Sequence, residues 1–163
     1  MKRLTAQYII TNSGPALKRA VINAEDNGTI ISIEDTAGEL KEKHSTEFYN
    51  GIIIPGFVNC HCHLELSHMK GFNSNGMGLG SFIEQIRSTR NNNKENIFSS
   101  SFSADNYMFK EGIVLCADVC NTTDSFKIKK ESRISYINLL EVFGLDPYKA
   151  GKRIDEILNV AES

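Results

Sequence analysis

The hydrophobic positions of the second half of the chain form short apolar runs that alternate with segments of helical periodicity. The run at residues 113–119 is almost wholly apolar, which suggests a central parallel strand, and residues 134–142 predict a further strand. Ile52 to Val58 is apolar apart from Gly56 and predicts a strand buried on both faces. Helices are predicted from Ser81, over residues 97–111 and after Gly144. Alternating strands and helices predict a parallel sheet with crossover helices, an α/β fold.

The spacing of apolar residues also assigns a buried face to each of the first two helices. In the helix that starts at Ser81, where Glu84 completes a capping box, this face comprises Leu79, Phe82, Ile83 and Ile86. In the helix over residues 97–111, the stripe of Phe98, Phe102 and Phe109 is expected to pack in the core, and Gly112 to end the helix.

The first part of the chain has the pattern of short β-strands joined by turns. Leu4 to Thr11 predicts a strand, and Asn27-Gly28 predicts a hairpin between residues 20–25 and 29–34. We therefore divide the chain into a small β domain, residues 1–50, and an α/β part, residues 51–163.

Composition and charge exclude several classes of function. The net charge of -2 gives no electrostatic case for binding nucleic acid or an anionic membrane, and no apolar run is long enough to span a bilayer. Residues 1–7 lack the apolar core of a signal peptide, so we expect a cytoplasmic protein with reduced thiols. Of the four cysteines, Cys116 and Cys120 are expected to be inert and buried.

Candidate chemistry follows the third apolar run, in the sequence Asn59-Cys60-His61-Cys62-His63-Leu64-Glu65. Side chains alternate along a strand, so His61 and His63 point the same way, with Cα atoms about 6.6 Å apart. Two imidazoles could converge on one metal ion from there. Asn59 and Glu65 share that face if the strand stays regular, and Cys60, Cys62 and Leu64 face the other way. The sequence thus predicts a metal site at the carboxyl end of a strand.

The stretch from Pro55 to Glu65 resembles the first-strand signature of the amidohydrolase superfamily, in particular its chlorohydrolase and deaminase branch. The resemblance covers the order of elements along the chain. It implies the N-terminal part of a (β/α)8 TIM-like barrel, about three βα units, preceded by a small β-sandwich, both incomplete. It further implies a divalent ion, zinc or iron, with His61 and His63 as ligands. The implied reaction is metal-dependent hydrolysis of non-peptide carbon–nitrogen bonds, such as deamination of a cyclic amidine or purine-like small molecule.

The chain departs from the family because the later ligands and the proton-transferring residues are missing. A barrel needs about 250 residues, so we expect those residues beyond residue 163 and expect this chain to be inactive alone. Two histidines are also expected to retain an ion poorly. Glu65 and His68 are candidate substrate-binding residues. Asp118 and Glu141, near strand ends, are expected to hydrogen-bond within the fold rather than to react.

Two alternatives remain open. The first is a non-catalytic fragment that forms homo-oligomers through exposed strand edges. The second is a small Cys/His zinc-binding protein that uses Cys60 and Cys62 with the histidines, although strand alternation directs these cysteines away from the imidazoles.

Overall fold

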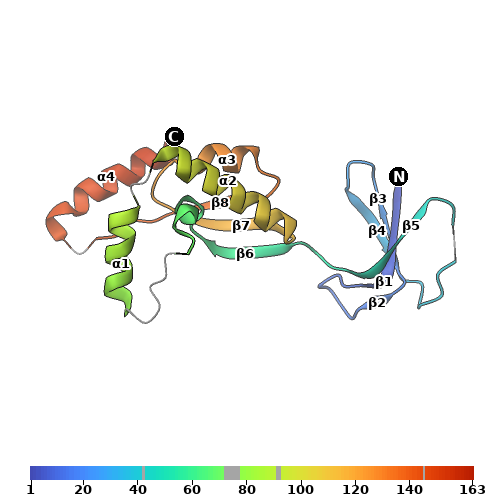
Figure 1. The fold of residues 1–163 in the computed structure, drawn as a ribbon. Coiled ribbons are helices and arrows are strands. Elements are labelled where there is room, and N and C mark those ends of the chain that lie inside the picture. Colours follow the sequence, from blue (N-terminus) through green and yellow to red (C-terminus); the bar gives the residue numbers. More distant parts are fainter. Residues whose placement is uncertain (42, 72–77, 91–92, 145) are drawn as a thin grey trace. The chain divides into compact units, whose positions relative to one another are not determined.

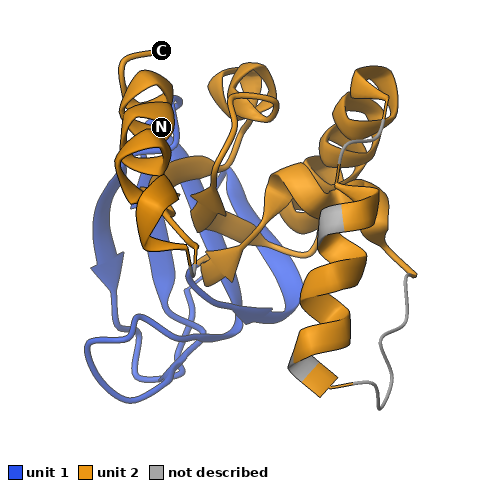
Figure 2. Ribbon diagram, turned by 90° about the vertical axis from the view of Figure 1, so that its left-hand side faces the viewer, with its two compact units in different colours: residues 1–55 blue, residues 56–163 orange. Residues whose placement is uncertain are grey.

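A computed structural model describes residues 1–41, 43–71, 78–90, 93–144 and 146–163. The chain divides into two compact units, Met1–Pro55 and Gly56–Ser163 (Figure 2). The division lies after Pro55 rather than after residue 50, because the last strand of the first unit extends to Ile53. None of the helices in the described ranges is both long and apolar enough to cross a membrane.

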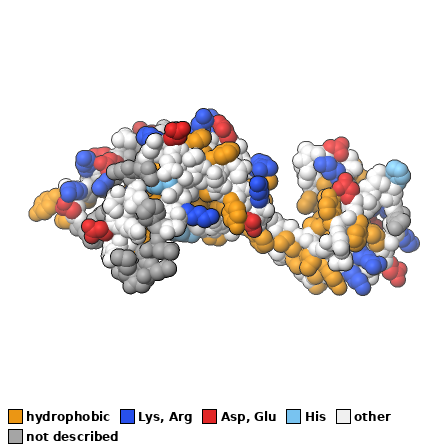
Figure 3. All heavy atoms as spheres, viewed as in Figure 1, with side chains coloured by type: hydrophobic (Ala, Val, Ile, Leu, Met, Phe, Trp, Pro, Cys, Tyr) orange, Lys and Arg blue, Asp and Glu red, His pale blue; other side chains and the backbone are white. Residues whose placement is uncertain are grey.

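The first unit is a single five-stranded sheet, so its described residues do not form the two layers of the expected sandwich. A small core forms around Ile9, Ala20 and Ile22, while apolar side chains of β4 (Ile30–Glu34) and β5 (Thr46–Ile53) are exposed (Figure 3). The Asn27-Gly28 hairpin is confirmed by the antiparallel pairing of β3 with β4 and by a Gly28 φ of 95°. The strands are β1 (Lys2–Ile9), β2 (Leu17–Lys18), β3 (Val21–Ala24), β4 (Ile30–Glu34) and β5 (Thr46–Ile53).

The second unit contains a three-stranded parallel sheet in the order β6-β7-β8, so the prediction of a parallel sheet is confirmed (Figure 1). Its strands are β6 (Phe57–Cys62), β7 (Ile113–Cys120) and β8 (Ser135–Leu140). The helical elements are the 3-10 turns η1 (Leu64–Met69) and η2 (Pro147–Lys149), with α1 (Gly78–Thr89), α2 (Lys94–Lys110), α3 (Phe126–Glu131) and α4 (Ala150–Ala161). Each strand is followed by helix, which places the three strand ends at one edge of the sheet.

The prediction of one buried strand from Ile52 to Val58 is wrong. Ile52 and Ile53 pair with β1 in the first unit, whereas Phe57 and Val58 begin β6 in the second. Both halves are apolar, so the change of sheet at Pro55 leaves no trace in the hydrophobic pattern. The residues of this run are also not buried as predicted, since Ile52 is 59% and Val58 54% exposed.

The expected buried faces of α1 and α2 are also wrong. In α1, which begins at Gly78 and not at Ser81, Phe82 and Ile83 are exposed; the side chain of Leu79 lies outside the described residues. In α2, Phe98 and Phe102 stack on each other in an exposed position.

The buried side chains of α2 are Ile97, Ser101 and Asp105 instead. Asp105 accepts hydrogen bonds from Ser132 Oγ at 2.6 Å and Tyr136 OH at 2.7 Å. This helix therefore turns polar groups inward because they satisfy donors of the neighbouring elements. Its end at Gly112, which has a φ of 87°, is confirmed.

Candidate metal centre

The two histidines of the predicted site lie at the carboxyl end of β6, His61 within the strand and His63 one residue beyond it. Their ring centroids are 5.1 Å apart and the ring planes are inclined at 72°. Two imidazoles that share a tetrahedral ion, with metal–nitrogen bonds of about 2.0–2.1 Å, have ring centres roughly 5 Å apart. The spacing of the rings therefore fits two ligands of one metal ion.

The strand does not stay regular, however, so alternation does not describe the surroundings of the histidines. The β6–β7 register shifts between Asn59 and Cys62. Asn59 directs its amide to Met108 of α2, with 3.8 Å between Nδ2 and Sδ. Glu65 lies in η1 rather than on a strand. The condition under which Asn59 and Glu65 were expected to share a strand face with the histidines, a regular strand through Glu65, is therefore not met.

Glu65 is held by a set of donors at the end of the neighbouring strand. Its side chain is 3% exposed and forms an ion pair with Arg90, which follows α1. The carboxylate also accepts hydrogen bonds from Thr122 Oγ1 at 2.7 Å, Thr122 N at 3.1 Å and Asn121 N at 3.3 Å. Substrate contact by Glu65 stays a prediction, and in the structure its oxygens are engaged within the protein.

The residue between His63 and Glu65 is fixed through its backbone. Leu64 N donates to Asp118 Oδ1 at 2.7 Å, and Leu64 O accepts from Ser101 Oγ at 2.9 Å. Asp118 is fully buried and forms an ion pair with Lys129, whose side chain is 5% exposed. The expectation that Asp118 hydrogen-bonds within the fold is confirmed.

His68 lies on the same groove as His63, a hollow of about 860 Å³ between η1 and α2. Its Nδ1 lies 3.2 Å from Glu65 O, while its Nε2 is buried without a partner within the described residues. The groove is also lined by hydroxyls and two thioethers, from Ser67, Ser99, Ser100, Ser103, Tyr107, Met69 and Met108. Contact of His68 with a substrate stays a prediction.

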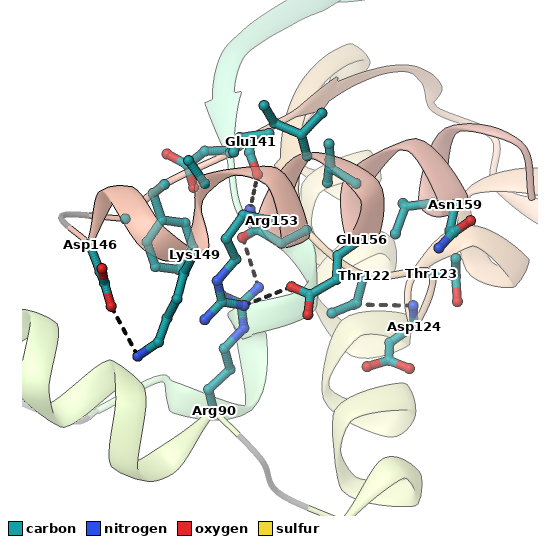
Figure 4. Close-up of a pocket in the computed structure, with 18 of the residues that line it drawn as sticks. Arg90, Thr122, Thr123, Asp124, Glu141, Asp146, Lys149, Arg153, Glu156 and Asn159 are labelled. Carbon is teal, nitrogen blue, oxygen red and sulfur yellow. Dashed lines mark hydrogen bonds and ion pairs between the residues drawn. The ribbon is translucent and has the colours of Figure 1, made fainter.

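A larger hollow of about 1430 Å³ opens at the ends of β7 and β8 (Figure 4), and no histidine lines it. Basic and acidic side chains alternate along it, and Arg153 donates to Glu156 at 2.8 Å. The Glu141 side chain is exposed; only its backbone is bonded, with Glu141 N donating to Cys120 O at 3.1 Å. Mixed charge of this kind selects no ligand, so the histidine pair remains the stronger candidate for chemistry.

The cysteines do not join the histidines. Burial, followed by the nearby Cys116 and Asp118, raises the pKa of Cys62 to about 12, and burial likewise raises the pKa values of Cys116 and Cys120. Cys116 and Cys120 are fully buried, as expected, whereas Cys60 is exposed. Within the described ranges, no cluster of three or more His, Cys, Asp or Glu side chains could hold a metal ion.

The sequence interpretation missed four residues that organise this region: Arg90, Asn121, Thr122 and Lys129. Asn121 and Thr122 could have been found, since they follow directly after the apolar run of β7, where strand-end groups gather. Arg90 and Lys129 carry no such signal, because each is defined by a partner distant in the sequence.

The chain thus folds as a β unit followed by parallel βα units, with a histidine pair at the end of the first parallel strand. No family model and no curated protein sequence matches the chain. Solved structures do match it, among them amidohydrolase-family deaminases and chlorohydrolases. The resemblance noted at Pro55–Glu65 is thus confirmed at the level of the fold.

Three of these structures illustrate the match. Aminofutalosine deaminase of Helicobacter pylori, in complex with methylthio-coformycin, has a TM-score of 0.76 and 19% identity over 99% of this chain and 41% of its own. A mutant of the Arthrobacter aurescens atrazine chlorohydrolase, complexed with zinc and atraton, has a TM-score of 0.69 and 16% identity over 100% of this chain and 43% of its own. An adenosine deaminase of Xanthomonas campestris with bound zinc has a TM-score of 0.62 and 12% identity over 97% of this chain and 39% of its own. The chain thus spans about two fifths of the proteins it matches.

Proposed function

We propose that this chain forms part of a metal-dependent hydrolase that acts on non-peptide carbon–nitrogen bonds. Deamination of a cyclic amidine or a purine-like compound is the narrower reaction that we propose. The observation that carries the proposal is the pair of imidazoles, 5.1 Å apart, at the carboxyl end of the first parallel strand. The fold shared with deaminases and a chlorohydrolase, some of them solved with zinc, supports it.

His61 and His63 would hold the ion, which we propose to be zinc or iron. When bound, a divalent ion supplies Lewis acidity and lowers the pKa of water toward neutrality. The protein's part is to keep both imidazoles on one side of the strand end. Catalytic zinc sites use three protein ligands, so we propose that two histidines bind metal weakly and that this chain alone has no activity.

Metal titration tests the proposal. We expect weak binding of one Co²⁺ or Zn²⁺ ion by the unmodified chain, measured by calorimetry, and none by the double variant His61→Ala/His63→Ala. His44→Ala is the matched control, because His44 is exposed in the first unit, where its Nδ1 lies 2.9 Å from Ser45 Oγ. Equal binding by the unmodified chain and the double variant would refute the assignment of the ligands.

An activity assay tests the second part of the proposal. Ammonia release from adenosine, as a purine-like probe, is expected to be absent with this chain even when Zn²⁺ is supplied. Release that disappears in His61→Ala/His63→Ala would show that the chain is active by itself.

A second candidate function is a non-catalytic module that associates with a second copy of itself. The observation that favours it is the apolar, exposed surface of β8, where Ile137 is 54% and Leu139 44% exposed. In the described part of the chain, this strand pairs on one side only, with β7. Light scattering after size exclusion should show dimers or larger species that Ile137→Lys dissociates. A monomer at all concentrations would exclude this candidate.

A further inference from the structure

The carboxylate of Glu65, two residues after His63, is bonded to several donor groups within the protein. The Glu65 carboxylate binds one guanidinium, two backbone amides and one hydroxyl, contributed by Arg90, Asn121 and Thr122. It is 3% exposed and is therefore placed to hold other groups rather than to meet a ligand from solvent.

Arg90 extends this arrangement to all three parallel strands. Its guanidinium bonds to Glu65 after β6 and donates to Asn121 Oδ1 after β7 at 2.8 Å. It also lies over the Phe143 ring after β8, 6.0 Å from the ring centroid. One side chain thus ties the ends of three neighbouring strands together.

The ion pair between Glu65 and Arg90 also connects two segments that are distant in the sequence. Glu65 and Arg90 are 25 residues apart, so their ion pair joins the beginning of η1 to the end of α1. Ordering the ends of such a segment costs loop entropy, which the charge-assisted bonds offset. Without Arg90, η1 would still be held by the bonds of Glu65 to Asn121 and Thr122 and by those of Leu64 to Asp118 and Ser101.

We propose that Glu65 and Arg90 are a positioning pair that sets the direction of the His63 imidazole toward His61. The purpose that we give to this pair, orienting a metal ligand, rests on the proposed function. The relative orientation of the two imidazole rings can nevertheless be measured without metal. Because Leu64 and Glu65 are both anchored, the peptide that carries His63 has little freedom to rotate. The carboxylate of Glu65 is accordingly a structural partner of the strand ends.

The experiment compares the unmodified, metal-free chain with Glu65→Gln, Arg90→Ala and Thr122→Val by NMR. The nuclear Overhauser effects between the His61 and His63 rings, whose centroids are 5.1 Å apart, should be lost in Glu65→Gln and Arg90→Ala. They should weaken in Thr122→Val, which removes one donor. Glu141→Gln is the matched control, since that carboxylate is exposed at the end of β8 and should leave the effects unchanged.

A Co²⁺ titration of the same variants gives the second measurement. Loss of orienting groups around a ligand typically weakens metal binding 10- to 100-fold, so we expect the Kd to rise about tenfold or more in Glu65→Gln and Arg90→Ala. If Glu65→Gln loses its far-UV circular dichroism, Thr122→Val decides instead. Unchanged ring effects and an unchanged Kd would overturn the positioning role while leaving the metal site intact. Lost ring effects in a chain that never binds Co²⁺ would support the positioning role and refute the metal proposal.

Discussion

The backbone of Gly56, at the entrance to β6, packs closely against Val114, and this packing leads to a sharp prediction. A Cβ added at Gly56 would lie 2.5 Å from Val114 Cγ1, 2.6 Å from Cγ2 and 3.1 Å from Cβ. Favourable contacts between carbon atoms lie at about 3.5–4.0 Å, so Gly56→Ala creates an overlap of about 1 Å. Rotating Val114 does not remove it, because two of the three staggered positions on a β-branched side chain are always filled.

The backbone has to move instead. Phe57 N donates to Gly112 O at 2.8 Å next to the overlap, and this bond starts the pairing of β6 with β7. Overpacking of this kind costs about 1–3 kcal/mol, a large share of the 5–15 kcal/mol that stabilises a typical domain. We therefore expect Gly56→Ala to lower the free energy of unfolding by about 1–3 kcal/mol.

Urea unfolding followed by far-UV circular dichroism measures this change, and Val114→Ala is the rescue. Val114→Ala removes both γ carbons from a side chain that is 44% exposed, so the double variant Gly56→Ala/Val114→Ala should regain most of the lost stability. Gly144→Ala is the control, because nothing lies within 4 Å of its added Cβ. A stability of Gly56→Ala within about 0.5 kcal/mol of the unmodified chain would refute the close packing, since exposed substitutions give changes of that size.

Three further predictions concern buried groups. A thiol reagent should label the exposed Cys60 in the folded chain but reach the fully buried Cys116 only on unfolding; equal rates would contradict the burial. Lys129→Met leaves the Asp118 carboxylate buried without its cation and should cost about 3–5 kcal/mol in a urea titration, whereas a loss below about 1 kcal/mol would show that the pair is not desolvated. Burial and a hydrogen bond to a carboxylate raise the pKa of Tyr136 above its usual 10.0, so the folded chain holds this proton more tightly. That stabilisation is complete below pH 10.0 and is lost as the pH rises further, so the urea midpoint should fall in that range more steeply than in Tyr136→Phe.

The elements that could be predicted are those in which one local signal decides the structure. Asn27-Gly28 specifies a hairpin turn, and the apolar run of β7 specifies a central strand, which pairs with β6 and β8. The elements that could not be predicted depend on which partner an apolar residue meets. The run from Ile52 to Val58 divides between two sheets, and the phenylalanines of α2 remain exposed while Ser101 and Asp105 turn inward.

For the candidate site, the sequence predicted the side chains but not what holds them. His61 and His63 were recognisable because strand alternation and their place after an apolar run are local features. The register shift before Cys62 and the turn of the chain into η1 altered their surroundings without changing any residue type. Arg90 lies 25 residues from Glu65 in the sequence, and only the fold brings the two together.

The charged groups near the histidines indicate which residues could complete a metal centre. Two neutral imidazoles leave the charge of a divalent ion uncompensated. Two buried carboxylates adjoin the segment that follows His63, Glu65 within it and Asp118 bonded to Leu64 N, and they are paired with Arg90 and Lys129 respectively. Turning either carboxylate toward a metal would take it away from its cation, and breaking a buried pair of this kind costs about 3–5 kcal/mol. We therefore expect the third ligand of a tight site to be a residue other than these two, and the affinity of His61 and His63 alone to stay weak.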